Sequence, residues 1–293
     1  MPEGDTLFRT AVTLRKALCN GVVIAFTSSV HSVALAESER PLAGRIVAAV
    51  ESRGKHLLIV FRDPSPDTVA RHAEHESTAE TSRDRLCLHP TDLVLHTHLR
   101  MTGSWHIYRP GEAWQKPASY AKAVVATDAF VAPCFSAPVV ELLSARQTER
   151  HPDLTTLGPD AIKEDFDCVK ALSLLRCRAD LPIGVALMDQ HAMAGVGNVF
   201  KSELLFIRRL SPFAPVRTLS DQSLSALIAE AHKLLMINRT IGNRRTMFRL
   251  DERQRLWVYG RSGEPCRVCS TMILMQRQGY DGRSTYYCPA CQA

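Results

Sequence analysis

The apolar residues near the start of the chain recur at helical spacing. Leu7, Ala11, Leu14 and Leu18 would all lie on one face of a helix. Asp5 is placed as the N-cap of that helix, because its side chain can accept from a free amide of the first turn. The pattern predicts an amphipathic helix over residues 5–18, which would hold residues 1–4 against a folded body.

From residue 22 to residue 143 the apolar positions form short or alternating runs, separated by turn-forming residues. This pattern predicts strands joined by turns. The clearest candidates are residues 45–50, 56–62, 92–98, 121–126 and 130–135.

From about residue 145 the apolar spacing becomes helical again. The predicted helical segments are residues 166–175, 182–188, 198–206 and 220–237. We therefore expect three domains, at residues 1–144, 145–262 and 263–293. Residues 63–85 contain almost no large apolar side chains, and we expect them to form a flexible surface insertion with no assigned role.

The composition is that of a folded protein, with 45% hydrophobic and 23% charged residues among 293. No run approaches the roughly 18 apolar residues of a membrane helix, and charges interrupt the first twenty residues where a signal peptide would be apolar. We expect an intracellular protein, cytoplasmic or associated with the nucleoid. Its net charge of +6 favours phosphate-rich partners, although many other proteins share such a charge.

The nine cysteines do not indicate a disulfide framework, because their number is odd and the chain is large. We expect reduced thiols. Four of them form a C-terminal pattern, and the other five lie among apolar neighbours, so we expect those five to be buried packing residues. The five are Cys19, Cys87, Cys134, Cys168 and Cys177.

The C-terminal cysteines form two CxxC pairs, Cys266 with Cys269 and Cys288 with Cys291. This spacing is typical of a tetrahedral four-thiolate zinc site, which leaves no open position for catalysis. About thirty residues cannot bury a sufficient core, so one structural zinc ion is expected to stabilise this segment. The alternative is a redox pair or unrelated cysteines. A hairpin between the pairs would present arginines to a groove or a phosphate.

The chain starts with Met1, Pro2 and Glu3. Loss of Met1 would expose a secondary amine whose pKa is near ~8, so that a useful fraction is neutral at physiological pH. Such an amine can attack a sugar C1′ and form a cationic iminium, which favours elimination. Glu3 would supply a proton if burial raises its pKa. The alternative is an ordinary start that precedes a helix.

Four short blocks together resemble the formamidopyrimidine-DNA glycosylase/endonuclease VIII family, in family order and over essentially the whole chain. They are the start at residues 1–5, the turn at 52–58, the glycine-rich segment at 194–200 and the ending at 282–289. The Glu3-Gly4 start is closer to the endonuclease VIII branch. The resemblance implies an α+β multidomain protein: an N-terminal β-sandwich flanked by helices, a helix-two-turns-helix domain and a zinc ribbon.

The resemblance also implies roles for single residues. Pro2 matches the Schiff-base nucleophile, Glu3 the catalytic acid, and Lys55 the lysine that assists the lyase step. Asn198 matches a phosphate contact. Arg283 matches the arginine of the zinc hairpin that grips a phosphate beside the lesion and assists the second elimination. Without the resemblance, Lys55 and Arg283 would be interpreted as surface charges.

Arg100 and Met101 match the loop that fills the gap left by an extruded nucleotide. As an isolated residue, Met101 would be assigned to the core. Two positions depart from the family pattern. Thr6 stands where a second glutamate is usual, and Thr156 where an arginine of endonuclease VIII-like proteins would contact DNA.

The leading hypothesis is a bifunctional base-excision-repair enzyme that removes oxidised bases and cleaves the strand through a Pro2 Schiff base. Oxidised pyrimidines are the expected substrates, and ring-opened purines are the alternative. The partner of this enzyme would be damaged DNA. We expect no membrane association and no small-molecule cofactor, and we expect the chain to be a monomer. A second hypothesis is an inactive protein that binds lesions or abasic sites. A third is a zinc-ribbon protein that binds other proteins. Trapping of a covalent adduct separates the first two, and salt-dependent DNA affinity excludes the third.

Overall fold

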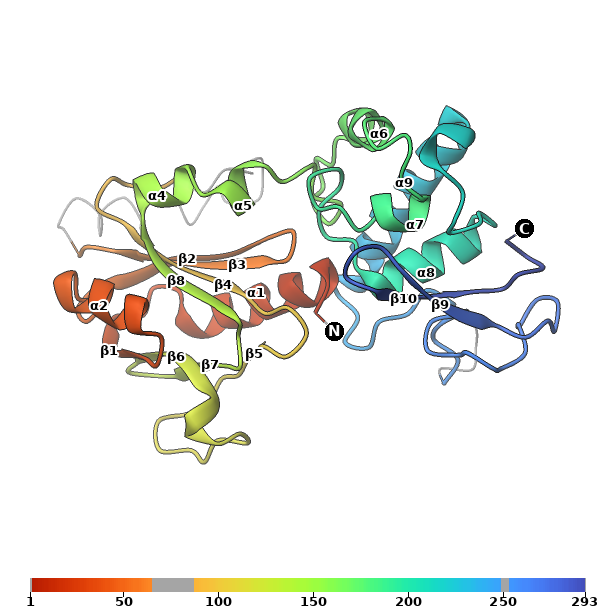
Figure 1. Ribbon diagram of the computed structural model, residues 1–293. Helices are drawn as coiled ribbons and strands as arrows, with labels where there is room; N and C mark the ends of the chain where they lie inside the picture. The colour runs from red at the N-terminus through yellow and green to blue at the C-terminus, as the bar shows by residue number, and fades with distance from the viewer. Residues whose placement is uncertain (1, 65–86, 249–252, 293) are drawn as a thin grey trace. The chain divides into compact units, whose positions relative to one another are not determined.

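The computed structural model describes residues 2–64, 87–248 and 253–292, so that the predicted insertion at 63–85 falls almost entirely outside the described residues. The chain divides into two compact units, labelled in Figure 1 by their elements. The first is Thr10–Thr155. The second combines Pro2–Arg9 with Thr156–Ala293. The boundaries at residues 144 and 262 remain predictions.

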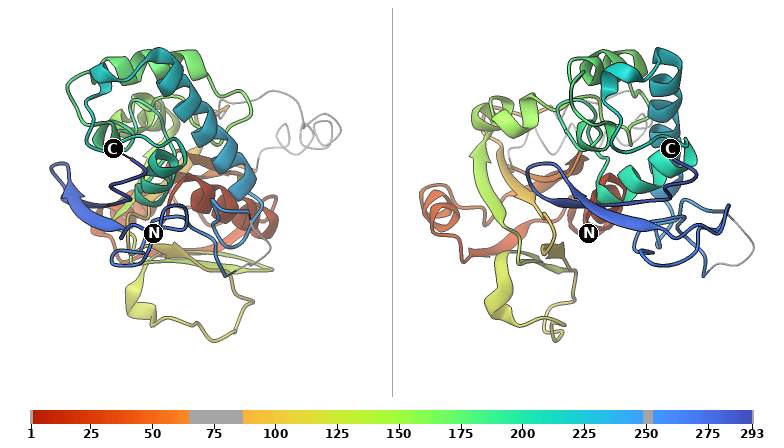
Figure 2. Two further views of the ribbon diagram at one scale, coloured as in Figure 1. Left: turned by 90° about the vertical axis from the view of Figure 1, so that its right-hand side faces the viewer. Right: turned by 45° about the vertical axis from the view of Figure 1, so that its right-hand side comes forward.

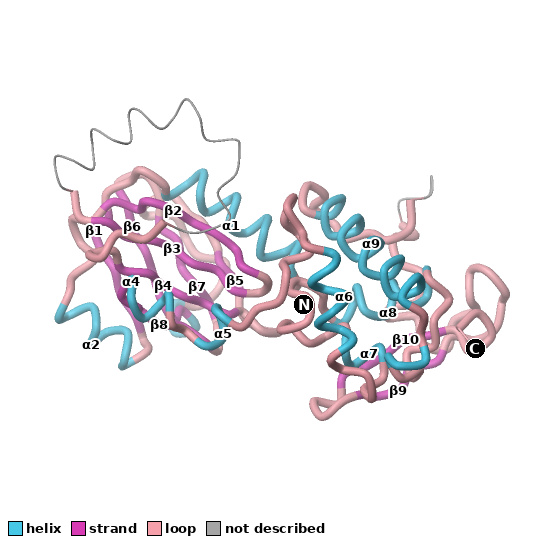
Figure 3. The backbone as a smooth tube through the Cα atoms, turned by 90° about the horizontal axis from the view of Figure 1, so that it is seen from above, coloured by secondary structure: helices cyan, strands magenta, loops and turns pink. Residues whose placement is uncertain are grey.

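The first unit is built on two four-stranded antiparallel sheets, drawn in magenta in Figure 3. One sheet has the order β1-β6-β7-β5, with β1 (Val23–Ser28), β6 (Ala121–Thr127), β7 (Val131–Phe135) and β5 (Ser104–Trp105). The other has the order β2-β3-β4-β8, with β2 (Ile46–Arg53), β3 (His56–Arg62), β4 (Leu93–His98) and β8 (Val139–Ser144).

Strand β3 contains an unbroken apolar run over residues 57–61, because both faces of the strand are buried there. Leu57, Ile59 and Phe61 point to one face, and Leu58 and Val60 point to the other. Burial on both faces explains why this strand lacks the alternation of a surface strand. It also places the β2–β3 turn on a rigid support.

Short helices complete the first unit. They are α2 (His31–Glu39), α4 (Ala145–Glu149), α5 (Pro152–Thr155) and the 3₁₀ helix η1 (Ala118–Tyr120). Ser144 caps α4 in a capping box with Gln147. Helix α2 was not expected, because Val33 is its one buried residue and its sequence has almost no apolar periodicity.

The second unit is helical around one apolar core (Figure 1). Its helices are α6 (Cys168–Arg176), α7 (Ile183–Ala186), α8 (Asn198–Ile207), α9 (Asp221–Asn238) and the 3₁₀ helix η2 (Val216–Thr218). The side chains of Asp167 and Ser220 cap α6 and α9. The core residues include Leu175, Leu187, Phe200, Leu204, Leu227 and Leu234. Helix α8 is buried along almost its whole length, so that side chains at its first turn are held rigidly.

The C-terminal hairpin consists of β9 (Leu274–Gln278) and β10 (Arg283–Tyr287), and β10 packs beside α8, as both views of Figure 2 show. Phe206 of α8 is buried in a small cluster with Val258, Ile273 and two of the C-terminal cysteines. This arrangement confirms the predicted hairpin. None of the helices in the described ranges is long and apolar enough to cross a membrane.

Helix α1 (Gly4–Leu18) begins one residue earlier than predicted, because the carbonyl of Glu3 accepts from Thr6 and Leu7. The assignment of Asp5 as N-cap is therefore wrong. Its carboxylate lies within the first turn and forms ion pairs with Arg9 and Arg244. The four predicted core positions of this helix are all buried.

The nine cysteines all lie in described residues and all are free thiols, as expected. Burial was predicted for the five cysteines outside the two CxxC pairs. This prediction is correct for Cys134 and wrong for three of the others. Cys87, Cys168 and Cys177 are exposed, and Cys19 is half-buried. Cys168 and Cys177 lie at the two ends of α6, where apolar neighbours along the sequence do not cover the helix ends.

Candidate active site

The first residues of the chain pack on the glycine-rich segment at residues 194–200. Pro2 is half-buried and Glu3 is completely buried. The amide of Gly4 donates to the carbonyl of Gly195 at 2.9 Å. A Cβ on Gly4 would come within 2.9 Å of the Gly195 Cα, closer than real Cβ contacts, so glycine is required here. This contact holds the backbone next to Pro2.

The carboxylate of Glu3 occupies the N-terminus of α8. Its Oε1 accepts from the amide of Val199 at 2.8 Å. Its Oε2 accepts from the amides of Gly197 at 3.1 Å and Phe200 at 3.3 Å. These amides would otherwise lack partners, and the helix start favours a negative charge. The N-cap residue of α8 is Gly197, which has no side chain that could accept from these amides. Glu3, from the N-terminus of the chain, therefore caps α8 instead.

The glycines of this segment are fitted to that contact. A Cβ on Gly197 would overlap the Cγ and Cδ of Glu3. Gly195 has a φ of +97°, which other residues rarely adopt, and a Cβ there would meet Asp160. The two glycines therefore bring backbone close to the acid beside Pro2, a role that the sequence did not predict for them.

Arg244 forms an ion pair with Glu3, and the sequence analysis did not identify this residue. Its Nη1 lies 3.5 Å from Glu3 Oε1, and its Nε donates to Asp5 Oδ2 at 2.9 Å. The guanidinium also stacks on the ring of Phe200. Burial alone would lower the pKa of Arg244, but the carboxylates of Glu3 and Asp5 outweigh it and raise that pKa. Arg244 is therefore a permanent cation beside the acid.

Asn198 and Lys201 connect the first turn of α8 to the zinc hairpin. The Nδ2 of Asn198 donates to Ser284 Oγ at 3.1 Å, and the side chain is only 3% exposed. The Nζ of Lys201 donates to Thr285 Oγ1 at 2.8 Å and to the Ser284 carbonyl at 3.2 Å. Both side chains therefore join α8 to β10.

Lys201 is a second residue that the sequence analysis missed. Burial lowers its pKa to about 8; the charge of Glu3 opposes this shift and that of Arg283 adds to it. A lysine within the apolar run of α8 is the one signal that could have indicated it. A buried amine on this helix adds a group whose charge changes near physiological pH.

Arg283 is the first residue of β10 and pairs with Gln278 in the hairpin. Its Nη2 lies 3.5 Å from Asp281 Oδ2, and the side chain is half-buried. The second unit thus brings together the predicted residues Pro2, Glu3, Asn198 and Arg283 on neighbouring segments.

Lys55 belongs to the first unit. It follows Gly54, which has a φ of +55°, in the two-residue turn that joins β2 and β3. The lysine is half-buried. The next residue, His56, is buried, and this burial together with neighbouring histidines and Lys55 lowers its pKa to about 2. His56 therefore stays neutral beside the lysine.

Arg100 and Met101 lie in a tight loop of the first unit. The amide of Gly103 donates to the carbonyl of Leu99 at 2.8 Å, and Arg100 has a φ of +44°. Met101 is 63% exposed. Its assignment to the core, the alternative interpretation, is therefore wrong. An exposed methionine on a strained turn is available to contact a partner.

The two residues that depart from the family pattern, Thr6 and Thr156, both lie in the part of the chain that the structure describes. The hydroxyl of Thr6 accepts from Arg244 Nη2 at 3.1 Å, so Thr6 belongs to the group of side chains that surrounds Asp5. Thr156 is exposed, and its carbonyl lies 2.9 Å from His191 Nδ1.

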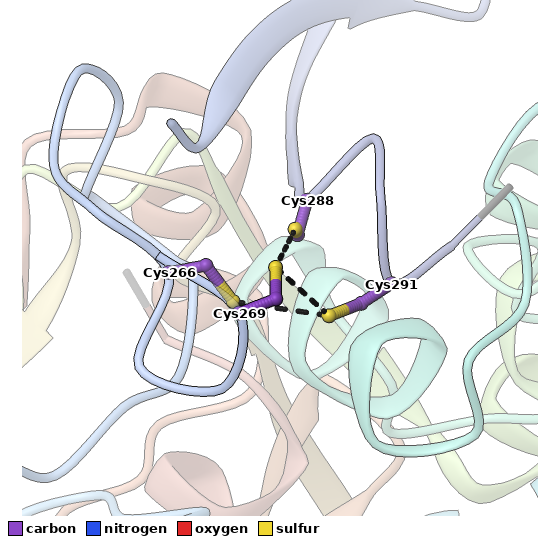
Figure 4. A group of neighbouring side chains, drawn as sticks. All are labelled: Cys266, Cys269, Cys288 and Cys291. Carbon is purple, nitrogen blue, oxygen red and sulfur yellow. Dashed lines mark hydrogen bonds between the residues drawn. The ribbon is translucent and has the colours of Figure 1, made fainter. Parts of the chain in front are cut away.

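The four C-terminal cysteines point toward one another (Figure 4). The Sγ atom of Cys269 lies 3.4 Å from those of Cys288 and Cys291, and the Cys266 and Cys291 sulfurs are 4.0 Å apart. Zinc–sulfur bonds of about 2.3 Å in a tetrahedron require sulfur separations of roughly 3.8 Å. Hydrogen bonds from Thr271 and from neighbouring thiols lower the pKa of Cys269 to about 6, which favours the thiolate. The four residues fit a structural zinc ion.

Three family models match the chain. They are the formamidopyrimidine-DNA glycosylase N-terminal domain over residues 1–138, the formamidopyrimidine-DNA glycosylase H2TH domain over residues 157–248, and a zinc finger found in FPG and IleRS over residues 263–293. Together these matches cover both units and the cysteine module.

Curated relatives match over the full length of the chain. A probable endonuclease 8 2 of Streptomyces coelicolor is 36% identical, covering 100% of this chain and 94% of that protein. The DNA-(apurinic or apyrimidinic site) lyase Nei2 of Mycolicibacterium smegmatis is 35% identical, covering 100% of this chain and 99% of that protein.

Solved structures share the fold. A MutM structure in complex with DNA containing carbocyclic 8-oxo-G has a TM-score of 0.77 at 22% identity, with both chains covered completely. An Fpg structure of Lactococcus lactis with DNA containing N7-benzyl-Fapy-dG also has a TM-score of 0.77 at 22% identity, and covers 99% of each chain. They confirm the expected fold: an N-terminal sheet domain, a helical domain and a C-terminal zinc finger.

Proposed function

Because the chain belongs to the formamidopyrimidine-DNA glycosylase/endonuclease VIII family, we propose that it is a bifunctional DNA glycosylase and abasic-site lyase of base excision repair. It removes oxidised bases from DNA and then cleaves the strand. Oxidised pyrimidines are the proposed substrates, in line with the endonuclease 8 names of its relatives. The proposed working form is a monomer.

Pro2 is the proposed nucleophile, acting after removal of Met1. The secondary amine attacks C1′ of the damaged nucleotide, the base leaves with a proton, and the sugar opens to give an iminium. The iminium withdraws electrons, so that a C2′ proton is lost and the 3′-phosphate is eliminated. Water then hydrolyses the iminium and regenerates the amine. An α-amine is neutral often enough near pH 7 to begin this sequence.

The observation that carries this proposal is the fixed position of Glu3. A completely buried carboxylate follows the proposed nucleophile directly and is held by three amides of α8 and by Arg244. A carboxyl in this place can give a proton to the opening sugar or to the leaving base. Arg244 acts as a positioning residue in this scheme.

The DNA contacts proposed for the second unit are Asn198 and Arg283, which flank the junction of α8 with β10. Lys201 adds positive charge to the same junction. From the first unit we assign Lys55 to the lyase step and Arg100 with Met101 to the space left by the extruded nucleotide. The zinc ion stabilises the hairpin that carries Arg283.

Borohydride trapping on a duplex with a single abasic site tests the proposal. The wild-type chain, with Met1 shown by mass spectrometry to be absent, should form one covalent adduct per strand, and peptide mapping should place it on Pro2. A chain with one extra residue before Pro2 has no free proline nitrogen and should form no adduct on Pro2, with DNA affinity within about threefold of wild type. Tight binding of abasic DNA with no wild-type adduct would instead support an inactive binding protein.

A further inference from the structure

A polar cluster lies within the first unit, apart from the residues assigned above to chemistry. It contains His56 of β3, His96 and His98 of β4, Glu141 of β8, and His151, which precedes α5. Three of these residues, His96, Glu141 and His151, each offer one metal-binding atom, and these atoms all lie within 4.8 Å of one another.

The distances suit a shared ion. Glu141 Oε2 lies 2.8 Å from His96 Nδ1 and 3.1 Å from His151 Nε2. Bonds of about 2.0–2.1 Å to one tetrahedral zinc ion place donor atoms roughly 3.3 Å apart, so small rotations of these side chains would suffice. Two imidazoles and one carboxylate form a common donor set for divalent transition metals.

His56 supplies the outer support that such a site requires. Its Nδ1 lies 2.8 Å from the Nε2 of His96, and both rings are buried. A metal-bound histidine usually donates its second N–H to a neighbouring acceptor, which fixes the ring and its tautomer. Here His56 can be that acceptor, which leaves the Nδ1 lone pair of His96 directed at the group formed with Glu141.

The cluster is accessible from solvent. The side chain of Glu141 is 40% exposed. His151 also lines a pocket of about 610 Å³ together with Arg40, Arg146 and Arg150. An ion can enter from this side, and the positive pocket favours water or a small anion as the fourth ligand. Asp153 lies close enough to interact electrostatically with His96, and its negative charge offsets part of the repulsion from the arginines.

We propose that His96, Glu141 and His151 form a second metal site, for a divalent transition metal such as Zn²⁺, separate from the four-cysteine zinc site. With three protein ligands it keeps one position open, whereas the four-thiolate site is closed. The alternative is a hydrogen-bond network without an ion, in which His96 and His151 donate to Glu141.

Equilibrium dialysis of the full chain against Zn²⁺ at neutral pH, followed by metal analysis, separates these alternatives. The wild type should hold two zinc ions per chain. Glu141→Gln keeps the size and the hydrogen-bond acceptor but removes the charge, and should hold one. His151→Asn should also hold one. The matched control His31→Asn, which removes an exposed histidine at the start of α2, should hold two.

Replacement of zinc by Co²⁺ shows which of the two sites each metal ion occupies. The four-thiolate site gives a sulfur-to-metal charge-transfer band, which should be the same in the wild type and in Glu141→Gln. The second cobalt ion should add only absorption of nitrogen and oxygen ligands, and this should disappear in Glu141→Gln. A single zinc ion in the wild type would overturn the proposal, as would two ions in both cluster variants.

Discussion

Helix α8 holds one buried carboxylate at its start and another in its middle, and the two are bound in different ways. At its start, Glu3 arrives from the N-terminus and accepts three amides of the helix. In its middle, Glu203 belongs to the helix itself and accepts the amides of Trp257, Val258 and Tyr259 at 2.7–2.8 Å. Both side chains are completely buried.

The difference lies in the surrounding charge. Glu3 faces the positive end of the helix and the guanidinium of Arg244. Glu203 receives a further hydrogen bond from the hydroxyl of Thr246, and its burial raises its pKa in spite of all four hydrogen bonds. For Glu203, therefore, accepting three amides does not prevent burial from raising the pKa of the carboxyl. Glu3, next to Pro2, lies beside the positive charge of Arg244. Glu203, which holds residues 257–259 ahead of the zinc ribbon, accepts from a hydroxyl and from backbone amides.

The sharpest test of this comparison exchanges each carboxylate for its amide. Glu3→Gln should lower base excision by about 10²–10⁴-fold, because the proposed proton carrier is lost. Glu203→Gln should change activity by less than about tenfold and lower the free energy of unfolding by about 1–3 kcal/mol, because an amide nitrogen then faces backbone N–H groups. Single-turnover excision and urea unfolding measure the two effects.

Glu3→Gln should retain most of its cleavage of preformed abasic sites, since no base has to leave there. Equal losses of excision in the two variants would show that burial of a carboxylate, rather than its place beside Pro2, is what matters, and the comparison would fail.

A smaller effect is expected from the glycine that makes room for Glu3. Gly197→Ala would place a Cβ on the Glu3 side chain and displace it, and a displacement of about 1 Å can cost roughly 10²-fold in rate. The matched control is Gly242→Ala, where a Cβ meets nothing within 4 Å. That control should be within about twofold of wild type in single-turnover excision. Similar activity of the two variants would mean that the Glu3 contact tolerates movement.

Elements with a local signal could be predicted from the sequence. The strands β3 and β4 and the helices α8 and α9 follow from the spacing of apolar residues, and the four cysteines follow from two CxxC pairs. The chemistry of Pro2 and Glu3 was inferred from the amine and its neighbour. These features depend on residues that are close in sequence.

The rest depends on contacts between distant residues. Arg244 reaches Asp5 across 239 positions, and Gly197 reaches Glu3 across 194. Nothing near Arg244 in the sequence indicates that partner. Lys201 and Glu203 lie in an apolar helix, but only the packing of β10 and of residues 257–259 shows why they are tolerated there. Cys168 and Cys177 were wrongly assigned for the same reason, since their burial depends on what covers the ends of α6.

The smallest expected effect concerns Lys201, which lies on α8 between the two carboxylates. Its pKa falls from an ordinary 10.5 to about 8 in the folded chain, so between these values the unfolded chain binds more protons. The free energy of unfolding should therefore rise with pH across this window, by about 2 kcal/mol from this group, and the cost of burying the charge is fully present below pH 8. Lys201→Met should lack this rise. Urea unfolding at pH 7.5 and pH 10 measures it for both chains. Parallel pH profiles would show that Lys201 keeps its ordinary pKa, and that the field of Glu3 compensates its burial completely.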